Sequence, residues 1–143
     1  RALRDLQGED GLWHTVLDDS TSYEETSGSA AITAGILKGI RMGILDDSYL
    51  PCAKKAIRAI LKNIDTDGTV LKVSGGTGMG YDRDHYKNIL IAPMAYGQSL
   101  TILALVEALE TLNDISLRLL LLRKRELAYG RRNRFIMQTT KNR

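Results

Sequence analysis

Two Asp-Gly turns, 57 residues apart, divide this chain into repeating units. Asp10-Gly11 and Asp67-Gly68 each precede a short strand-like stretch, a polar loop and then a helix-like run. A repeating unit of two helices and a strand-bearing loop, with the loops gathered at one end, is how an α/α barrel is built. The sequence therefore predicts an all-α fold that forms part of an α/α barrel, with short β-strands in the loops.

The first long helix is expected from residue 27 to about residue 43. Ser27 can accept a hydrogen bond from a free amide of the first turn. Glycines recur every four residues, at Gly35, Gly39 and Gly43. Because glycine costs roughly 1 kcal/mol in a helix interior, this row predicts close approach by a neighbouring helix or a ligand. Gly43 alternatively acts as a C-cap.

Two further helices are expected. Residues 48–64 carry one apolar face, which predicts an outer, half-solvated helix. Residues 93–112 are apolar nearly all round, which predicts a buried helix. Short strands are expected at residues 12–17 and 69–73, a glycine-rich loop at 74–80, and a polar loop at 81–88.

The length limits how much of a barrel this chain can form. The 143 residues hold two to three helical hairpins, whereas a closed ring of six needs roughly twice this length or more. We therefore expect the remaining hairpins to lie upstream. A partial ring exposes apolar helix faces unless they pair or are covered, so oligomer formation through those faces is also open.

The net charge of +3 conceals a split along the chain. Residues 1–117 carry 11 basic and 16 acidic side chains, and residues 118–143 carry 9 basic and 1 acidic. We predict a barrel part at residues 1–113 and a basic tail at residues 114–143. The tail is a frameshifted or fused end, an added helix that packs on the barrel, or a nucleic-acid segment. Nucleic acid is disfavoured as a partner because only Tyr129 and Phe135 could stack on bases there.

The compartment is predicted from the cysteine and the apolar runs. Cys52 is the single cysteine, so no internal disulfide can form, and no stretch resembles a secretion signal. No apolar run approaches the roughly 20 residues of a membrane span. A reducing compartment without membrane partners is expected.

Four motifs occur in order between residues 6 and 112. Residues 10–13 read Asp-Gly-Leu-Trp, residues 25–30 read Glu-Thr-Ser-Gly-Ser-Ala, residues 38–40 read Lys-Gly-Ile, with Gly43 following, and residues 73–80 read Val-Ser-Gly-Gly-Thr-Gly-Met-Gly. In this order and spacing they resemble the late hairpins of the unsaturated rhamnogalacturonyl hydrolases (glycoside hydrolase family 105). The unsaturated glucuronyl hydrolases share the barrel and are the nearest alternative.

This resemblance implies an (α/α)6 barrel of the six-hairpin glycosidase type, a cytoplasmic setting, no cofactor and a small oligosaccharide substrate. The substrate would carry the C4=C5 double bond that polysaccharide lyases leave in a terminal uronic acid. Family members are thought to protonate that enol ether and add water at C5, which gives a hemiketal that releases the next sugar. Their acid is an aspartate in the amino-terminal half, and no position here matches it. We therefore predict no catalytic residue in this chain and keep a non-catalytic remnant as an alternative.

The first candidate substrate-binding residues lie around the first strand and helix. Trp13 can stack on a sugar face or anchor the core. Glu25 and Ser27 stand at a helix start, where free amides can hold an anion such as the substrate carboxylate. Capping alone also explains the serine. His14 is interpreted as a strand-face residue.

The remaining candidates lie in the glycine-rich loop and just after it. Gly76 and Thr77 can bring backbone amides close to a carboxylate or hydroxyl, or form a plain connection. His85 and Tyr86 can contact sugar or belong to a solvated loop. Asp82 and Asp84 beside His85 lack further ligands at metal-binding spacing, so no metal site is predicted.

Overall fold

A computed structural model describes residues 1–112 of the chain, and the basic tail predicted from residue 114 lies outside the described residues. Within that part the predicted helix-dominated fold is confirmed. Its elements in order are α1 (Ala2–Asp5), β1 (Trp13–His14), β2 (Glu24–Glu25), α2 (Thr26–Arg41), the 3-10 helix η1 (Asp47–Tyr49), α3 (Leu50–Lys62), α4 (Arg83–Lys87) and α5 (Ala95–Thr111).

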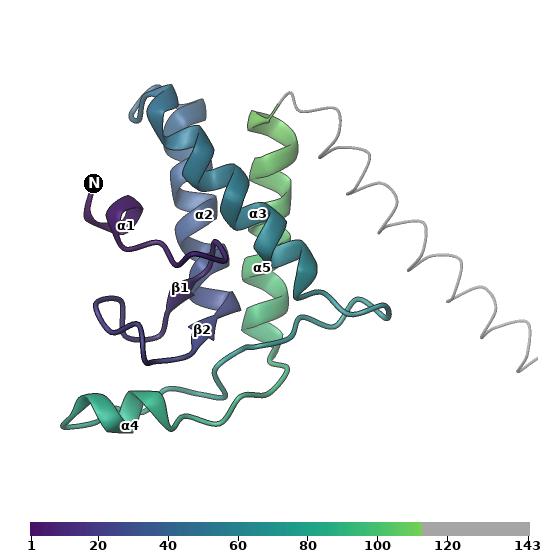
Figure 1. The fold of residues 1–143 in the computed structure, drawn as a ribbon. Helices are drawn as coiled ribbons and strands as arrows, with labels where there is room; N and C mark the ends of the chain where they lie inside the picture. The colour runs from purple at the N-terminus through teal and green to yellow at the C-terminus, as the bar shows by residue number, and fades with distance from the viewer. Residues whose placement is uncertain (113–143) are drawn as a thin grey trace, which may run out of the picture.

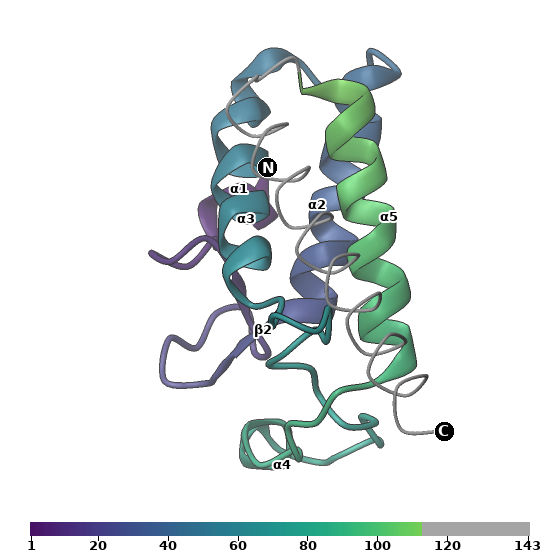
Figure 2. The ribbon, with the colours of Figure 1, turned by 90° about the vertical axis from the view of Figure 1, so that its right-hand side faces the viewer.

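The three long helices stand side by side (Figure 1). The loops that bear β2 and α4 gather at the lower end in that view, which we call the loop end, whereas the connection between α2 and α3 lies at the upper end. Helices α2 and α5 both begin at the lower end in that view and run in the same direction. Helix α3, which lies between them in sequence, runs in the opposite direction. Figure 2 shows α3 and α5 on either side of α2, and α2 contacts both of them far more than they contact each other. β1, β2 and α4 all lie at the loop end, as expected for helical hairpins with loops at one mouth.

Helix α2 begins one residue earlier than expected and is capped by a different residue. The Glu25 side chain, not that of Ser27, accepts hydrogen bonds from the backbone N–H groups of Ser27 and Gly28. A carboxylate both satisfies these free amides and interacts well with the positive end of the helix dipole. The alternative role of Gly43 is confirmed at the other end. Its φ is 69°, and its N–H donates to Ile40 O at 2.9 Å as the residue after the C-cap.

Within residues 1–112 the glycine row on α2 marks no contact with another helix, and the alternative that it approaches a ligand stays a prediction. A Cβ added at Gly35 would meet nothing within 4 Å, and one at Gly39 would meet only the side chain of Leu45. The close approach is made by small residues on α5 instead. They are buried along its length, namely Gly97, Thr101, Ala104 and Ala108. Since small side chains let two backbones approach, these residues decide which face of α5 packs on α2.

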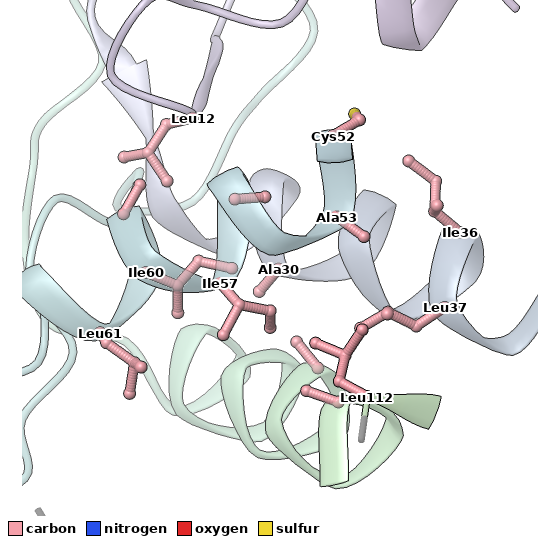
Figure 3. Packing of buried hydrophobic residues seen from close by; sticks show 14 of the residues in the cluster. Leu12, Ala30, Ile36, Leu37, Cys52, Ala53, Ile57, Ile60, Leu61 and Leu112 are labelled. Atoms are coloured by element: carbon pink, nitrogen blue, oxygen red, sulfur yellow. The ribbon is translucent and has the colours of Figure 1, made fainter. Parts of the chain in front are cut away.

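The hydrophobic core lies between the three long helices (Figure 3). Helix α3 is amphipathic as predicted, because Ala53, Ile57 and Ile60 are buried while Lys55 and Lys62 remain exposed. The same cluster includes Leu37 of α2 and Leu112, which directly follows α5. Burying one such large side chain contributes roughly 1.5–3 kcal/mol.

The prediction that the helix at residues 93–112 is buried on all sides is wrong. Its large apolar residues on one face remain 40–55% exposed, namely Ile102, Leu103, Val106 and Leu109. Apolar composition all round predicts burial only when a neighbour covers every face, and α2 covers just the face of small residues. Helix α5 thus exposes an apolar face, as expected for a partial ring, and the partial ring itself stays a prediction.

The loop segments contain less strand and more helix than predicted. The first strand is confined to residues 13–14 and pairs antiparallel with residues 24–25. No strand forms at residues 69–73; isolated bridges join Ile64 to Val70 and Ser74 to Ile91. The φ of Lys72 is 53°, which interrupts an extended strand there. The polar loop expected at residues 81–88 includes α4, which Asp82 caps by accepting from the His85 N–H.

Candidate functional site

A cavity of about 580 Å³ opens at the loop end of the helices. Its walls come from β1 and the following loop, the first two turns of α2, the glycine-rich loop, α4 and the start of α5. The lining residues are Trp13, His14, Thr15, Leu17, Glu25, Ser27, Gly28, Ser29, Ile32, Ser74, Gly76, Thr77, Tyr86, Tyr96 and Leu100. Hydroxyl groups and aromatic rings therefore share the lining with apolar side chains, a mixture suited to a polar ligand with flat faces.

Glu25 stands at the centre of the polar wall and is buried. Its Oε1 accepts from Ser27 N at 3.0 Å, from Ser27 Oγ at 2.6 Å and from Ser74 N at 3.1 Å. Its Oε2 accepts from Gly28 N. The chain's own carboxylate thus occupies the helix start where an external anion was predicted. These contacts give the capping role to Glu25, with Ser27 as a donor to its carboxylate, and they tie the helix start to the glycine-rich loop.

Ser74 connects three separate elements to that loop. Its N–H donates to Glu25, its Oγ lies 2.8 Å from Tyr23 OH, and its carbonyl accepts from Tyr96 OH. Tyr96 OH in turn accepts from the N–H of Gly76 at 3.0 Å. The φ of Gly76 is 81°, a left-handed conformation that favours glycine. This wall of the cavity is therefore fixed by side chains that reach it from both sides.

Trp13 lines the cavity but is only 1% exposed. Its indole Nε1–H donates to Leu3 O at 2.7 Å, and its backbone N–H donates to Ser29 Oγ at 2.8 Å. These contacts anchor α1 and β1 to the body of the protein. The core role is thus the one that the structure describes for Trp13, and stacking on a sugar stays a prediction.

His14 lies between two cavities. Its Nδ1 is 2.5 Å from the Ser22 carbonyl oxygen, and since a carbonyl only accepts, Nδ1 carries the proton. A second cavity of about 650 Å³ lies on the other side of His14 and is rich in acids, among them Asp5, Asp18 and Glu24. His14 and Leu17 thus line both the first cavity and this acidic one.

Helix α4 is attached to the loop between β1 and β2 by one exposed and one half-buried ion pair. Arg83 NH2 lies 2.9 Å from Asp18 Oδ2, and Lys87 Nζ lies 2.6 Å from Asp19 Oδ2. Lys87 Nζ also donates to Thr21 Oγ1 at 2.7 Å. The hydrogen bond from Lys87, followed by those from Thr21, holds the pKa of the Asp19 carboxyl well below its ordinary value. These contacts keep Tyr86 at the cavity rim.

Six of the seven predicted substrate-binding residues line this cavity. They are Trp13, Glu25, Ser27, Gly76, Thr77 and Tyr86. His85 does not line it; the ring stands edge-on to Tyr86, and its Nε2 lies 3.1 Å from Gly78 O. Lining a cavity is not evidence of ligand contact, so all seven stay predictions. Sequence reasoning missed Ser74, Tyr23 and Tyr96, although Ser74 lay inside a motif that had been singled out.

Among residues 1–112, no group of three or more His, Cys, Asp or Glu side chains is arranged to hold a metal ion. No helix within that range is both long enough and apolar enough to cross a bilayer. The polar groups that line the described cavity are hydroxyls, backbone amides, aromatic rings, the His14 imidazole and the Glu25 carboxylate.

Comparison with known proteins gives consistent matches. The model of Glycosyl Hydrolase Family 88 matches residues 1–112. The unsaturated rhamnogalacturonyl hydrolase YesR of Bacillus subtilis (strain 168) is 37% identical over 115 residues, which cover 77% of this chain and 30% of that protein.

Solved structures give the same result. The crystal structure of a possible member of the GH105 family from Salmonella enterica superimposes with a TM-score of 0.74 at 46% identity, covering 76% of this chain and 29% of that one. A family 105 glycoside hydrolase from C. acetobutylicum superimposes with a TM-score of 0.68 at 28% identity, covering 77% of this chain and 35% of that one. The chain thus spans between 29% and 35% of the length of these three relatives.

Proposed function

The chain belongs to Glycosyl Hydrolase Family 88, and on that basis we propose that it forms part of a hydrolase acting on unsaturated uronyl oligosaccharides made by polysaccharide lyases. The sequence resemblance to family 105 is confirmed by the YesR match and by the two solved structures. The substrate class follows from the name of YesR, which is an unsaturated rhamnogalacturonyl hydrolase.

The observation that carries the proposal is the cavity at the loop end. Hydroxyl-bearing Thr15, Ser27 and Thr77 and the rings of Tyr86 and Tyr96 line it. Sugars are bound by hydrogen bonds from such groups and by contact of their flat faces with aromatic rings. We propose that this cavity is one wall of the substrate site in a partial (α/α)6 barrel, and the exposed face of α5 supports a ring that continues beyond this chain.

The proposed reaction is hydration of the C4=C5 double bond. A carboxylic acid protonates the enol ether, water adds at C5, and the resulting hemiketal opens to release the neighbouring sugar. Glu25 is a poor candidate for this acid because its Oε1 already accepts three hydrogen bonds. We therefore propose that residues 1–112 bind and orient the sugar and that the acid comes from outside this stretch.

A chimera tests the proposed function. Residues 1–112 would replace the matching stretch of YesR, and the hydrolysis of an unsaturated rhamnogalacturonyl disaccharide would be followed by the loss of its double-bond absorbance. We expect the chimera to retain activity and the 143-residue chain alone to show none. A folded chimera that leaves this disaccharide intact but clears an unsaturated glucuronyl disaccharide would identify the sister activity. A folded chimera inactive on both would favour the non-catalytic remnant.

The setting of this activity is part of the same proposal. We propose a cytoplasmic protein whose partner is a small oligosaccharide, without nucleic acid or membrane partners and without a cofactor. Self-association through the exposed face of α5 is the proposed oligomer contact, and light scattering at increasing protein concentration measures it.

A further inference from the structure

Every polar backbone and side-chain group of Ser74 is engaged by a different element. The N–H donates to Glu25 at the start of α2, and the Oγ pairs with Tyr23 OH just before β2. The carbonyl accepts from Tyr96 OH at the start of α5. Ser74 is also buried. A residue held at three points by α2, by the segment before β2 and by α5 has little freedom to move.

Tyr96 differs from the other two partners because its hydroxyl bridges two peptide groups. It donates to the Ser74 carbonyl and accepts from the Gly76 N–H at 3.0 Å. The same Gly76 N–H lies 3.1 Å from the Ser74 carbonyl, so the hydroxyl closes a tight turn from outside. Gly76 is exposed and has a positive φ, and without a partner such an exposed glycine would sample many conformations.

This turn forms the cavity wall itself. Ser74, Gly76 and the next residue, Thr77, all line the cavity, and so does Tyr96. The backbone beneath the turn is paired to the returning strand of the loop, since Gly75 N donates to Leu90 O at 2.6 Å and Ala92 N donates to Val73 O at 2.9 Å. Beyond this paired base, the turn is held by its own Gly76 N–H to Ser74 carbonyl contact and, from outside the loop, by the Tyr96 hydroxyl.

We propose that Tyr96 is a positioning residue that presets the Ser74–Thr77 wall in its ligand-binding shape. A wall that is ordered before binding spares the ligand the entropy of ordering it. The identity of the ligand, an unsaturated uronyl oligosaccharide, rests on the proposed function above. The positioning role concerns the protein's own backbone and is measurable without a ligand.

The first test measures amide hydrogen exchange by NMR in the 143-residue chain and its Tyr96→Phe variant, which keeps the ring and loses the hydroxyl. We expect the Gly76 amide to exchange about fivefold faster or more, because it loses the Tyr96 hydroxyl as an acceptor and keeps only the Ser74 carbonyl. The Ser74 amide, which donates to Glu25, should change by less than about twofold. Tyr81→Phe, at a side chain that is 98% exposed, serves as the matched control.

The pattern of exchange decides the question. Unchanged exchange at Gly76 would overturn the proposal. Equal acceleration at Gly76 and Ser74, together with a lower unfolding midpoint, would also overturn it, because Tyr96 would then act only on overall stability. Selective acceleration at Gly76 with an unchanged midpoint supports it.

The second test titrates both proteins with an unsaturated rhamnogalacturonyl disaccharide and follows the amide signals of Gly76 and Thr77. We expect the Kd of Tyr96→Phe to rise about three- to tenfold over the unsubstituted chain. Equal affinity in both would overturn the role of Tyr96 in binding. Failure of the unsubstituted chain to bind the sugar would defeat the proposed function, and the exchange experiment would still decide the positioning role.

Discussion

The base and the tip of the pocket loop, residues 73–92, are attached to the rest of the protein by different kinds of contact. At its base the loop is attached through buried hydrogen bonds, and Glu25 and Ser74 are both less than 10% exposed. At its tip, α4 is attached through the ion pair of Arg83 with Asp18, whose side chains are 60% and 61% exposed, and through the half-buried pair of Lys87 with Asp19. Buried bonds are costly to leave unmade, whereas exposed ion pairs contribute little and weaken with salt. The cavity therefore has one fixed wall at the base and one adjustable wall at the tip.

The largest effect is expected at the base. Glu25→Ala removes the acceptor for the N–H groups of Ser27, Gly28 and Ser74 at once. We expect a loss of about 2–4 kcal/mol in the free energy of unfolding, from the lost helix cap and the unpaired buried donors. Chemical denaturation followed by circular dichroism measures this loss. Glu24→Ala, at the adjacent and less buried position, is the control. Equal losses in the two variants would show that the buried base is no stronger than its surroundings.

A smaller effect is expected from one contact within the base. Ser74→Ala removes the Oγ that pairs with Tyr23 OH and leaves both peptide groups of the residue in place. Its cost should be about 1 kcal/mol, the usual contribution of one hydrogen bond. Tyr23→Phe removes the other half of the same pair and should cost a similar amount. If the double variant costs the full sum of the two single variants, the contact contributes no coupling energy.

The stability that contacts at the tip contribute should depend on salt concentration, whereas the stability from contacts at the base should not. Arg83→Ala removes the ion pair to Asp18, in which the two side chains are 60% and 61% exposed. We expect a stability loss below about 1 kcal/mol that shrinks as ionic strength rises, because exposed pairs are screened. Denaturation at low and high salt measures both quantities, with Lys62→Ala on α3 as the control. A loss equal to that of Glu25→Ala would erase the contrast between tip and base.

Acid offers a separate way to examine the tip. The pKa of Asp19 is held below its ordinary 3.8, first by the hydrogen bond from Lys87. A carboxyl whose folded pKa is depressed contributes stability above the ordinary pKa, and this contribution is lost as pH falls through the folded value. The Asp19 contact should therefore persist at pH values where an unpaired aspartate is already protonated. NMR titration of the Asp19 carboxyl carbon should show a midpoint below 3.8 that rises in Lys87→Ala. An unshifted midpoint would contradict the ion pair.

The smallest change in the free energy of unfolding is expected at Tyr81, next to α4. Tyr81 is 98% exposed, and a surface substitution of this kind usually changes stability by less than about 0.5 kcal/mol. Tyr81→Ala should leave both the unfolding curve and the exchange rates of the pocket loop unchanged. A measurable change would mean that Tyr81 contributes to fastening the tip.

Periodicity was enough to predict the long helices. The apolar face of α3 and the positions of α2 and α5 follow from repeating apolar residues, because a helix that buries one side requires that spacing. The same reasoning failed for α5, since composition cannot say which faces will find a neighbour. Small residues such as Ala104 and Ala108 carry that information, yet they give weak hydrophobic signals.

The candidate site was predictable in part. Glycines and serines around Gly76 and Ser27 marked the right segments, because turns and helix starts need those residue types. The roles of Glu25 and Tyr96 depend on residues about 49 and 20 positions away in the chain. Such pairings have no local signature, and neither does the positive φ of Lys72 that replaces the expected strand.

The exposed apolar face of α5 is a suitable place for substitutions that raise solubility. Ile102, Leu103, Val106 and Leu109 lie outside the cavity lining, and none belongs to the core cluster. Lysine or glutamate at these positions would raise solubility and keep good helix propensity, with the pocket chemistry untouched. A charge-decorated version of the chain would make concentrated samples attainable for spectroscopy.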